Sequence, residues 1–369
     1  MGTRLPIAAA LVLLLPLAGA AAMGKPLAAY LQFPPKTPDV PHAPFSLPVF
    51  LGLTVLILAA TAFLLLRLIT SGRKDGPRKP AIPFPRWGWA GAALGAASWF
   101  LAWSRFPWMG GFQAHTFTPL WIAFILLVNA FTVRRTGRCL MLSQTRRFLL
   151  LFPVSAVFWW SFEYLNRFVG NWRYVGVTEF GQVGYFLFAT LPFSTVLPAV
   201  LSTRELLLSS PRLDGAFREG RPLSPAKPGA IGLAALLLSC VGLFAVGIVP
   251  DLVFALVWVA PPTLLISLAA LRRETHSLSG IASGDWRPAI SSVVAALLCG
   301  FFWEMWNFGS AAKWVYDIPY VNVLHVFEMP LLGYAGYLPF GVLCAEIGDF
   351  IVGGVREEQK KIPVSQRVG

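Results

Sequence analysis

The sequence predicts an all-α, polytopic transmembrane helical bundle of about nine spans, made of two parallel four-helix repeats and one extra N-terminal span. Three observations predict it: the composition, the alternation of apolar segments with basic loops, and an internal duplication. The chain has 369 residues, of which 56% are hydrophobic and 13% charged, whereas a soluble domain carries about 25% charged residues. Such a chain cannot cover a water-facing surface, so a lipid bilayer is its expected solvent.

The N-terminal segment, residues 1–22, has the pattern of a secretory signal peptide. Arg4 precedes a short apolar core, and the stretch ends in small residues. The alternative is an uncleaved helix, but the apolar core is short for a span, which favours cleavage. Residues 23–46 are rich in proline, which opposes helix formation, and we expect them to form an extended periplasmic arm.

Apolar segments long enough to cross ~30 Å of hydrocarbon recur along the rest of the chain. The expected spans are residues 47–69, 87–103, 117–133, 148–168, 182–201, 229–250, 252–271, 289–307 and 323–345. The organisation that follows is a first transmembrane helix at 47–69, membrane repeat 1 at 87–201, a cytoplasmic linker at 202–228, membrane repeat 2 at 229–350 and a cytoplasmic tail at 355–369.

Every second loop between these segments is rich in Lys and Arg. Of the 30 Lys and Arg residues, 23 lie in residues 67–86, 134–147, 202–228, 272–287 and 355–369. This is the positive-inside pattern, which places the arm outside and the C-terminus inside. The net charge of +13 then reflects topology and attraction to anionic lipid, so membrane lipid is the expected partner and nucleic acid is not.

One pattern occurs twice: a Glu and an Asn three residues apart, followed by Trp-X-Tyr and a span with Leu-Pro. The first copy contains Glu163, Asn166, Trp172 and Tyr174, and the second contains Glu304, Asn307, Trp314 and Tyr316, at offsets of 141 and 142 residues. Four spans per copy give both copies the same orientation. We therefore expect parallel repeats related by an axis along the membrane normal.

Glu163 and Glu304 are the first candidates for catalytic groups. Each lies about 24–26 Å along its helix from the cytoplasmic face, beneath the outer boundary of the hydrocarbon. The Asn three residues later shares its helix face. We expect both faces to meet at one outward-opening cavity, where the Asn, Trp and Tyr residues of the two copies bind substrate. Alternatively, each Glu–Asn pair bonds the loop of its own hairpin, and the Trp and Tyr residues anchor the interface.

The second copy carries two further candidate catalytic residues, His325 and Glu328, placed at i and i+3 where the last span is expected to begin. The matching stretch of the first copy, residues 183–201, has no Asp, Glu, Lys, Arg or His. The alternative is an interfacial pair that reaches water. These two residues and Glu304 could supply three metal ligands, but the chain has only four His residues, and we predict neither a metal nor another cofactor.

The run from Phe301 to Phe340, with WEMWNF, KWVYDIPYV and FEMPLLGYAGYLPF, resembles a group of bacterial polytopic inner-membrane proteins. The stretch from Phe117 to Cys139 is similar to the same group. The resemblance covers about residues 80–350. It implies a multi-pass protein of the bacterial inner (cell) membrane and implies no activity.

The function favoured at this point is a membrane-embedded enzyme or binding protein for a lipid or isoprenoid-type ligand. Buried glutamates near the periplasmic face would act as general acid or base, and aromatic side chains would hold an apolar chain. The first alternative is a membrane scaffold or assembly factor with structural glutamates. The second is a transporter with parallel repeats, whose site should lie nearer the midplane.

Overall fold

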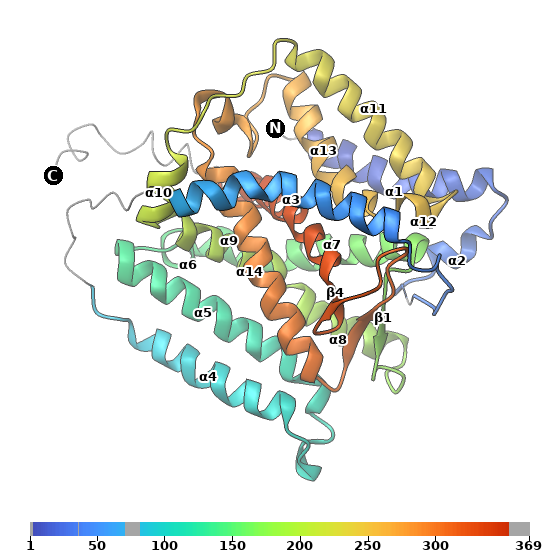
Figure 1. The fold of residues 1–369 in the computed structure, drawn as a ribbon. Coiled ribbons are helices and arrows are strands. Elements are labelled where there is room, and N and C mark those ends of the chain that lie inside the picture. Colours follow the sequence, from blue (N-terminus) through green and yellow to red (C-terminus); the bar gives the residue numbers. More distant parts are fainter. Residues whose placement is uncertain (1–2, 36, 71–81, 354–369) are drawn as a thin grey trace.

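The computed structural model describes residues 3–35, 37–70 and 82–353, and this part of the chain is a bundle of helices (Figure 1). The cytoplasmic tail predicted at 355–369 and part of the basic loop 67–86 lie outside the described residues. The helices are α1 (Arg4–Ala22), α2 (Leu27–Leu31), α3 (Leu47–Thr70), α4 (Arg86–Trp103), α5 (Phe117–Thr136), α6 (Leu140–Ser143), α7 (Thr145–Val169), α8 (Gln182–Phe193), α9 (Val196–Leu208), α10 (Pro211–Phe217), α11 (Pro228–Val246), α12 (Pro250–Val253), α13 (Leu256–Leu271), α14 (Arg287–Gly309) and α15 (Tyr337–Val352).

Eight helical stretches of the described chain are long and apolar enough to cross a membrane, as a multi-pass protein requires. They are Arg4–Ala22, Leu47–Thr70, Gln113–Thr136, Thr145–Val169, Gln182–Leu208, Pro228–Val246, Arg287–Gly309 and Leu331–Val352. A shorter apolar helix covers Leu256–Leu271. The prediction of a helical transmembrane bundle is therefore confirmed at this level, and most of the expected segments recur within a few residues.

The last predicted span is the exception, because the prediction of a helix from residue 323 was wrong. Residues 325–330 form a tight hairpin of β3 (His325–Val326) and β4 (Met329–Pro330), and the apolar helical stretch begins only at Leu331. Leu324 and Phe327 have positive φ angles of 55° and 58°, which no α-helix accommodates. Pro330 disfavours helical geometry at the residue before it.

The arm also differs from its prediction in one detail. α2 forms between Pro26 and the next prolines, so the arm contains one short helix. Residues 37–46 form no helix or strand and are held to the bundle by hydrogen bonds. His42 Nδ1 lies 2.8 Å from a carboxylate oxygen of Asp251, and the Ala43 amide donates to the other oxygen at 2.8 Å. The Ser46 amide donates to the Tyr320 carbonyl at 3.0 Å.

The helices pack closely because small residues stand where two of them meet. α14 packs against both α9 and α15. α4 lies along α5, and α11 lies along α13 (Figure 1). A Cβ on Gly341 of α15 would overlap the backbone of Ser292 in α14, so only glycine allows this approach. Such small-residue contacts are the usual means by which helices associate in lipid.

A short antiparallel ribbon joins the ends of α7 and α14, which the all-α prediction did not contain. It consists of β1 (Trp172–Val175) and β2 (Lys313–Tyr316). Trp172 lies opposite Tyr316, and Tyr174 lies opposite Trp314. The duplicated Trp-X-Tyr motifs therefore meet each other across the ribbon, and we refer to this end of the bundle as the ribbon end.

The N-terminal helix α1 is packed into the bundle against α7, α11 and α13. Gly19 lies so close to Phe244 and Gly247 of the α11 end that a Cβ would overlap their backbone. Arg4 is buried, with Nη2 at 3.4 Å from the Glu346 carboxylate and Nη1 donating to the Thr275 carbonyl at 3.3 Å. These contacts favour the uncleaved helix, the alternative to a signal peptide.

We predict that the mature protein retains α1. Intact-mass measurement of the purified full chain should give a mass that includes residues 4–22, and a mature N-terminus near residue 23 would contradict the prediction.

Arg4→Gln should lower the free energy of unfolding by about 3–5 kcal/mol, because it leaves Glu346 buried without its ion-pair partner. Arg218→Gln is the control, because Arg218 is exposed and Asp214 keeps its ion pair with Arg287 when Arg218 is replaced, so the cost should be about 0–1 kcal/mol.

Candidate functional site

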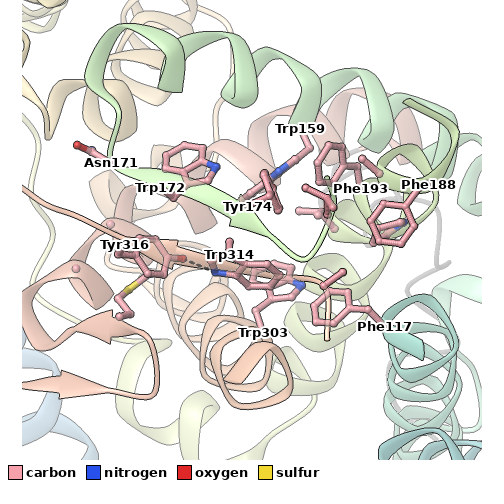
Figure 2. Close-up of a pocket in the computed structure, with 18 of the residues that line it drawn as sticks. Phe117, Trp159, Asn171, Trp172, Tyr174, Phe188, Phe193, Trp303, Trp314 and Tyr316 are labelled. Atoms are coloured by element: carbon pink, nitrogen blue, oxygen red, sulfur yellow. Dashed lines mark hydrogen bonds between the residues drawn. The ribbon is translucent and has the colours of Figure 1, made fainter. Parts of the chain in front are cut away.

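A cavity of about 100 Å³ lies beside the ribbon, and its wall is mostly aromatic (Figure 2). Five Trp, four Tyr and three Phe side chains line it, and they come from both halves of the chain. They are Phe117, Trp159, Trp172, Tyr174, Tyr185, Phe188, Phe193, Trp258, Trp303, Trp314, Tyr316 and Tyr337. All four Trp and Tyr residues that the duplication singled out are among them.

Glu163 lies behind this wall on α7, and its side chain is buried, with 2% of the residue exposed. One carboxylate oxygen, Oε1, accepts three hydrogen bonds from residues that line the cavity. The donors are Trp159 Nε1 at 2.9 Å, Trp172 Nε1 at 3.2 Å and the Tyr174 hydroxyl at 2.7 Å. Burial and the nearby carboxylate raise the pKa of Tyr174 well above its ordinary value, so its phenol remains a donor at neutral pH.

Glu304 occupies the corresponding place on α14 and is fully buried. Its Oε1 accepts from the hydroxyls of Tyr316 at 2.8 Å and Tyr337 at 2.7 Å. Trp314 Nε1 donates to the Tyr316 hydroxyl at 2.9 Å, which extends the network by one step (Figure 2). The second oxygen, Oε2, has no hydrogen-bond partner among the described residues.

Each carboxylate has one aromatic hydrogen-bond donor that does not come from the ribbon, and the two copies supply this donor from different helices. Trp159 stands four residues before Glu163 and donates to it, whereas the residue four before Glu304 is Gly300. A Cβ on Gly300 would overlap the ring of Tyr337, so the glycine makes room for that ring. Val196, which is 141 residues before Tyr337, lines the cavity without a polar group. One copy thus supplies the donor from its own helix and the other from the next helix.

The two asparagines hold the ribbon and do not line the cavity. Asn166 Nδ2 donates to the Trp172 carbonyl at 2.6 Å, and the Trp172 amide donates to Asn166 Oδ1 at 3.3 Å. Asn307 makes the same pair of bonds with Trp314, at 2.7 and 2.8 Å. The amides predicted to bind substrate are therefore occupied by the backbone of the strand that follows each helix.

His325 and Glu328 lie apart from the glutamate networks. Glu328 forms an ion pair with Lys313 at 2.5 Å. His325 is exposed, and its Nε2 lies 3.2 Å from Asn322 Oδ1. The helical face that was expected to join them does not exist, because both belong to the β3–β4 hairpin. Neither lines the cavity, although the next residue, Met329, does.

The site has an unusual charge balance. No described Lys, Arg or His forms an ion pair with Glu163 or Glu304, and no basic side chain is among the residues that line the cavity. In the described chain, no three His, Cys, Asp or Glu side chains come together in a way that could hold a metal ion. The arrangement combines an apolar, aromatic space with two carboxylates one layer behind its wall.

Several lining residues were missed because they do not belong to the repeated motif. Trp258, Trp303 and Tyr337 come from helices of the second half, and Asn171 precedes β1. Trp159 could have been identified because it stands four residues before Glu163 on the same helix. Tyr337 could have been identified because it lies in the apolar stretch after the hairpin. Trp258 and Asn171 have no local signal, because only the packing brings them to the cavity.

Comparisons of this chain with protein-family models, with curated proteins and with solved structures find no match. The geometry of the site therefore carries the functional argument.

Substituting Gly300 tests whether it makes room for Tyr337. We predict that Gly300→Ala pushes the Tyr337 ring away from Glu304 and lowers the free energy of unfolding by about 1–3 kcal/mol, since a buried acceptor loses a donor. Thermal unfolding in detergent, followed by tryptophan fluorescence, measures this. Gly52→Ala on α3 is the control, because nothing lies within 4 Å of its Cβ, and alanine is the better helix former.

The double variant with Tyr337→Phe distinguishes the cause of the loss. If Gly300→Ala acts by displacing the Tyr337 hydroxyl, the two losses should fall short of additive. Full additivity would contradict the assigned role of Gly300.

Proposed function

We propose that this protein is a membrane-embedded binding protein, or an enzyme, for a lipid or isoprenoid-type ligand whose apolar part occupies the aromatic cavity. The observation that supports this proposal most directly is that the hydrogen-bond donors of both buried glutamates line one cavity. Twelve aromatic side chains give this space an apolar surface, as ligand pockets commonly have. The positive-inside pattern favours an orientation with the ribbon end outside, and the resemblance to bacterial inner-membrane proteins makes that side the periplasm.

The proposal includes two parallel repeats that share the cavity. The ribbon places Arg173 opposite Val315, which correspond at the offset of 142. A two-fold axis through this pair would exchange the two Trp-X-Tyr motifs. The same axis accounts for two ring contacts between the halves: Phe117 with Trp314 at 5.3 Å between ring centroids, and Trp258 with Trp172 at 5.6 Å. Phe117 and Trp258 are themselves 141 residues apart.

The glutamates would act through the wall rather than by direct contact. Tyr174 and Tyr316 line the cavity and donate to Glu163 and Glu304. In an enzyme, the tyrosine hydroxyl would transfer a proton between a bound ligand and the carboxylate behind it, which is one form of general acid–base catalysis. In a binding protein, the carboxylates would fix the aromatic rings in place.

A scaffold or assembly factor is the second candidate, and one observation favours it. Each Asn holds the backbone of its own ribbon strand, and Glu163 bonds the side chains of that same strand. These contacts stabilise a hairpin without any ligand. A transporter is less favoured, because the cavity lies at the ribbon and not at mid-depth of the bundle.

Filling the cavity tests ligand binding. We predict that Ala312→Phe, which places a ring at the lining, displaces a lipid that co-purifies with the wild-type protein. Its neighbour Ala311 does not line the cavity, so Ala311→Phe is the matched control and should retain the lipid. Mass spectrometry of solvent extracts measures the bound amount. No bound lipid in wild type, or equal amounts in both variants, would contradict the proposal.

Neutralising the glutamates separates the proposed function from the scaffold. We predict that Glu163→Gln and Glu304→Gln reduce bound ligand or activity while folded protein is still recovered, because glutamine keeps the shape and one acceptor. Size-exclusion profiles in detergent and the lipid extract measure the two quantities on one sample. A loss of folded protein with unchanged ligand per folded molecule would favour the scaffold.

A further inference from the structure

We propose that the aromatic cavity binds an alkylated ammonium group, carried by a small cation or by a lipid headgroup. This inference rests on the proposed function only in that the aromatic cavity binds a ligand, and it replaces the apolar chain in that cavity with an ammonium group whose alkyl substituents contact the rings. Two features support it: the aromatic surfaces of the cavity, and the two buried carboxyl groups behind them, which have no basic partner among the described residues.

The first feature is the number and placement of aromatic rings. Rings of Trp172, Tyr174, Trp303 and Trp314 gather along the ribbon side of the cavity (Figure 2). Three of these residues direct their polar atoms toward the glutamates: Trp172 and Tyr174 donate to Glu163, and Trp314 donates to Tyr316, which bonds Glu304. This leaves ring surface to the ligand. A cation against several such surfaces is attracted by the ring quadrupoles, and quaternary ammonium groups are bound in this way.

The second feature is the pair of buried carboxyl groups that have no basic partner. Glu163 and Glu304 accept hydrogen bonds only from neutral donors among the described residues. Those donors stabilise the charged form of a carboxylate, yet an unpaired charge in an apolar interior costs several kcal/mol. A cation in the cavity would offset this cost, since it would lie one aromatic layer from both groups.

The nearby basic residues do not supply that cation. Arg173 and Lys313 belong to the ribbon, and each is paired on another side. Arg173 lies 3.2 Å from Asp39 of the arm, and Lys313 lies 2.5 Å from Glu328 of the hairpin. Neither lines the cavity, so the charges of these two residues are neutralised away from it.

The test compares choline with its uncharged carbon isostere, in which a tert-butyl group replaces the trimethylammonium group. The full chain is purified in a maltoside detergent, which has no ammonium group, and each probe is titrated while tryptophan fluorescence is followed. We expect choline to bind at least ~10-fold more tightly than the isostere, because only the cation gains from the rings and the carboxylates.

A second arm identifies the source of the ammonium group. Nanodiscs of phosphatidylcholine are compared with nanodiscs of phosphatidylglycerol, and the unfolding temperature of the protein is measured in each. A raised unfolding temperature in phosphatidylcholine alone, without binding of free choline, would assign the group to a lipid headgroup. Binding of free choline in detergent, with equal unfolding temperatures in the two kinds of nanodisc, would assign it to a small cation.

Variants connect the binding to the cavity. Glu163→Gln combined with Glu304→Gln should weaken choline or headgroup binding by ~10-fold or more, whereas Glu179→Gln, at an exposed carboxylate outside the cavity, should leave it unchanged. Trp258→Leu should weaken binding and Trp258→Phe should restore part of it, since this pair leaves both glutamate networks intact.

The outcomes separate this inference from the proposed function. If neither choline nor phosphatidylcholine binds in preference to its comparison probe, the ammonium inference is overturned. A co-purified neutral lipid that Ala312→Phe displaces would still support the proposed function in that case. The absence of any ligand would contradict both.

Discussion

The burial of two carboxylates in an apolar bundle determines the arrangement of the ribbon end. An unpaired charge in such an interior costs several kcal/mol, and neither Glu163 nor Glu304 has a basic partner among the described residues. Each therefore depends on indole and phenol donors, which are the polar groups that large apolar side chains can offer. Because these donors come from the ribbon and from neighbouring helices, satisfying the carboxylates also fixes the rings that line the cavity.

The two copies solve the same problem with different residues. Glu163 receives a bond from Trp159 on its own helix, whereas Glu304 receives one from Tyr337 on α15, with Gly300 making room for the ring. The constraint that both copies share is the supply of donors, not the identity of one residue. The asparagines are more uniform, because a strand backbone offers the same amide and carbonyl in both copies.

The sequence was most informative where a pattern is local. Long apolar segments predicted the helices, and the repeated Glu–Asn and Trp-X-Tyr motifs identified both carboxylates and four lining residues. The ribbon was missed because a four-residue strand carries too few positions to show a period of two. His325 and Glu328 were placed on a helix because their surroundings are apolar, but Pro330 and the positive φ angles at Leu324 and Phe327 turn that stretch into a hairpin.

What the sequence by itself determined is which segments enter the bundle and which carboxylates go with them, because hydrophobicity and spacing along a helix are properties of neighbouring residues. The tertiary structure decided which rings surround the cavity and what each carboxylate bonds. Trp258 contacts Trp172, and Tyr337 reaches Glu304, across separations that no local pattern encodes. Close packing of the helices selects these partners, since a donor is useful to a buried charge only at hydrogen-bond distance.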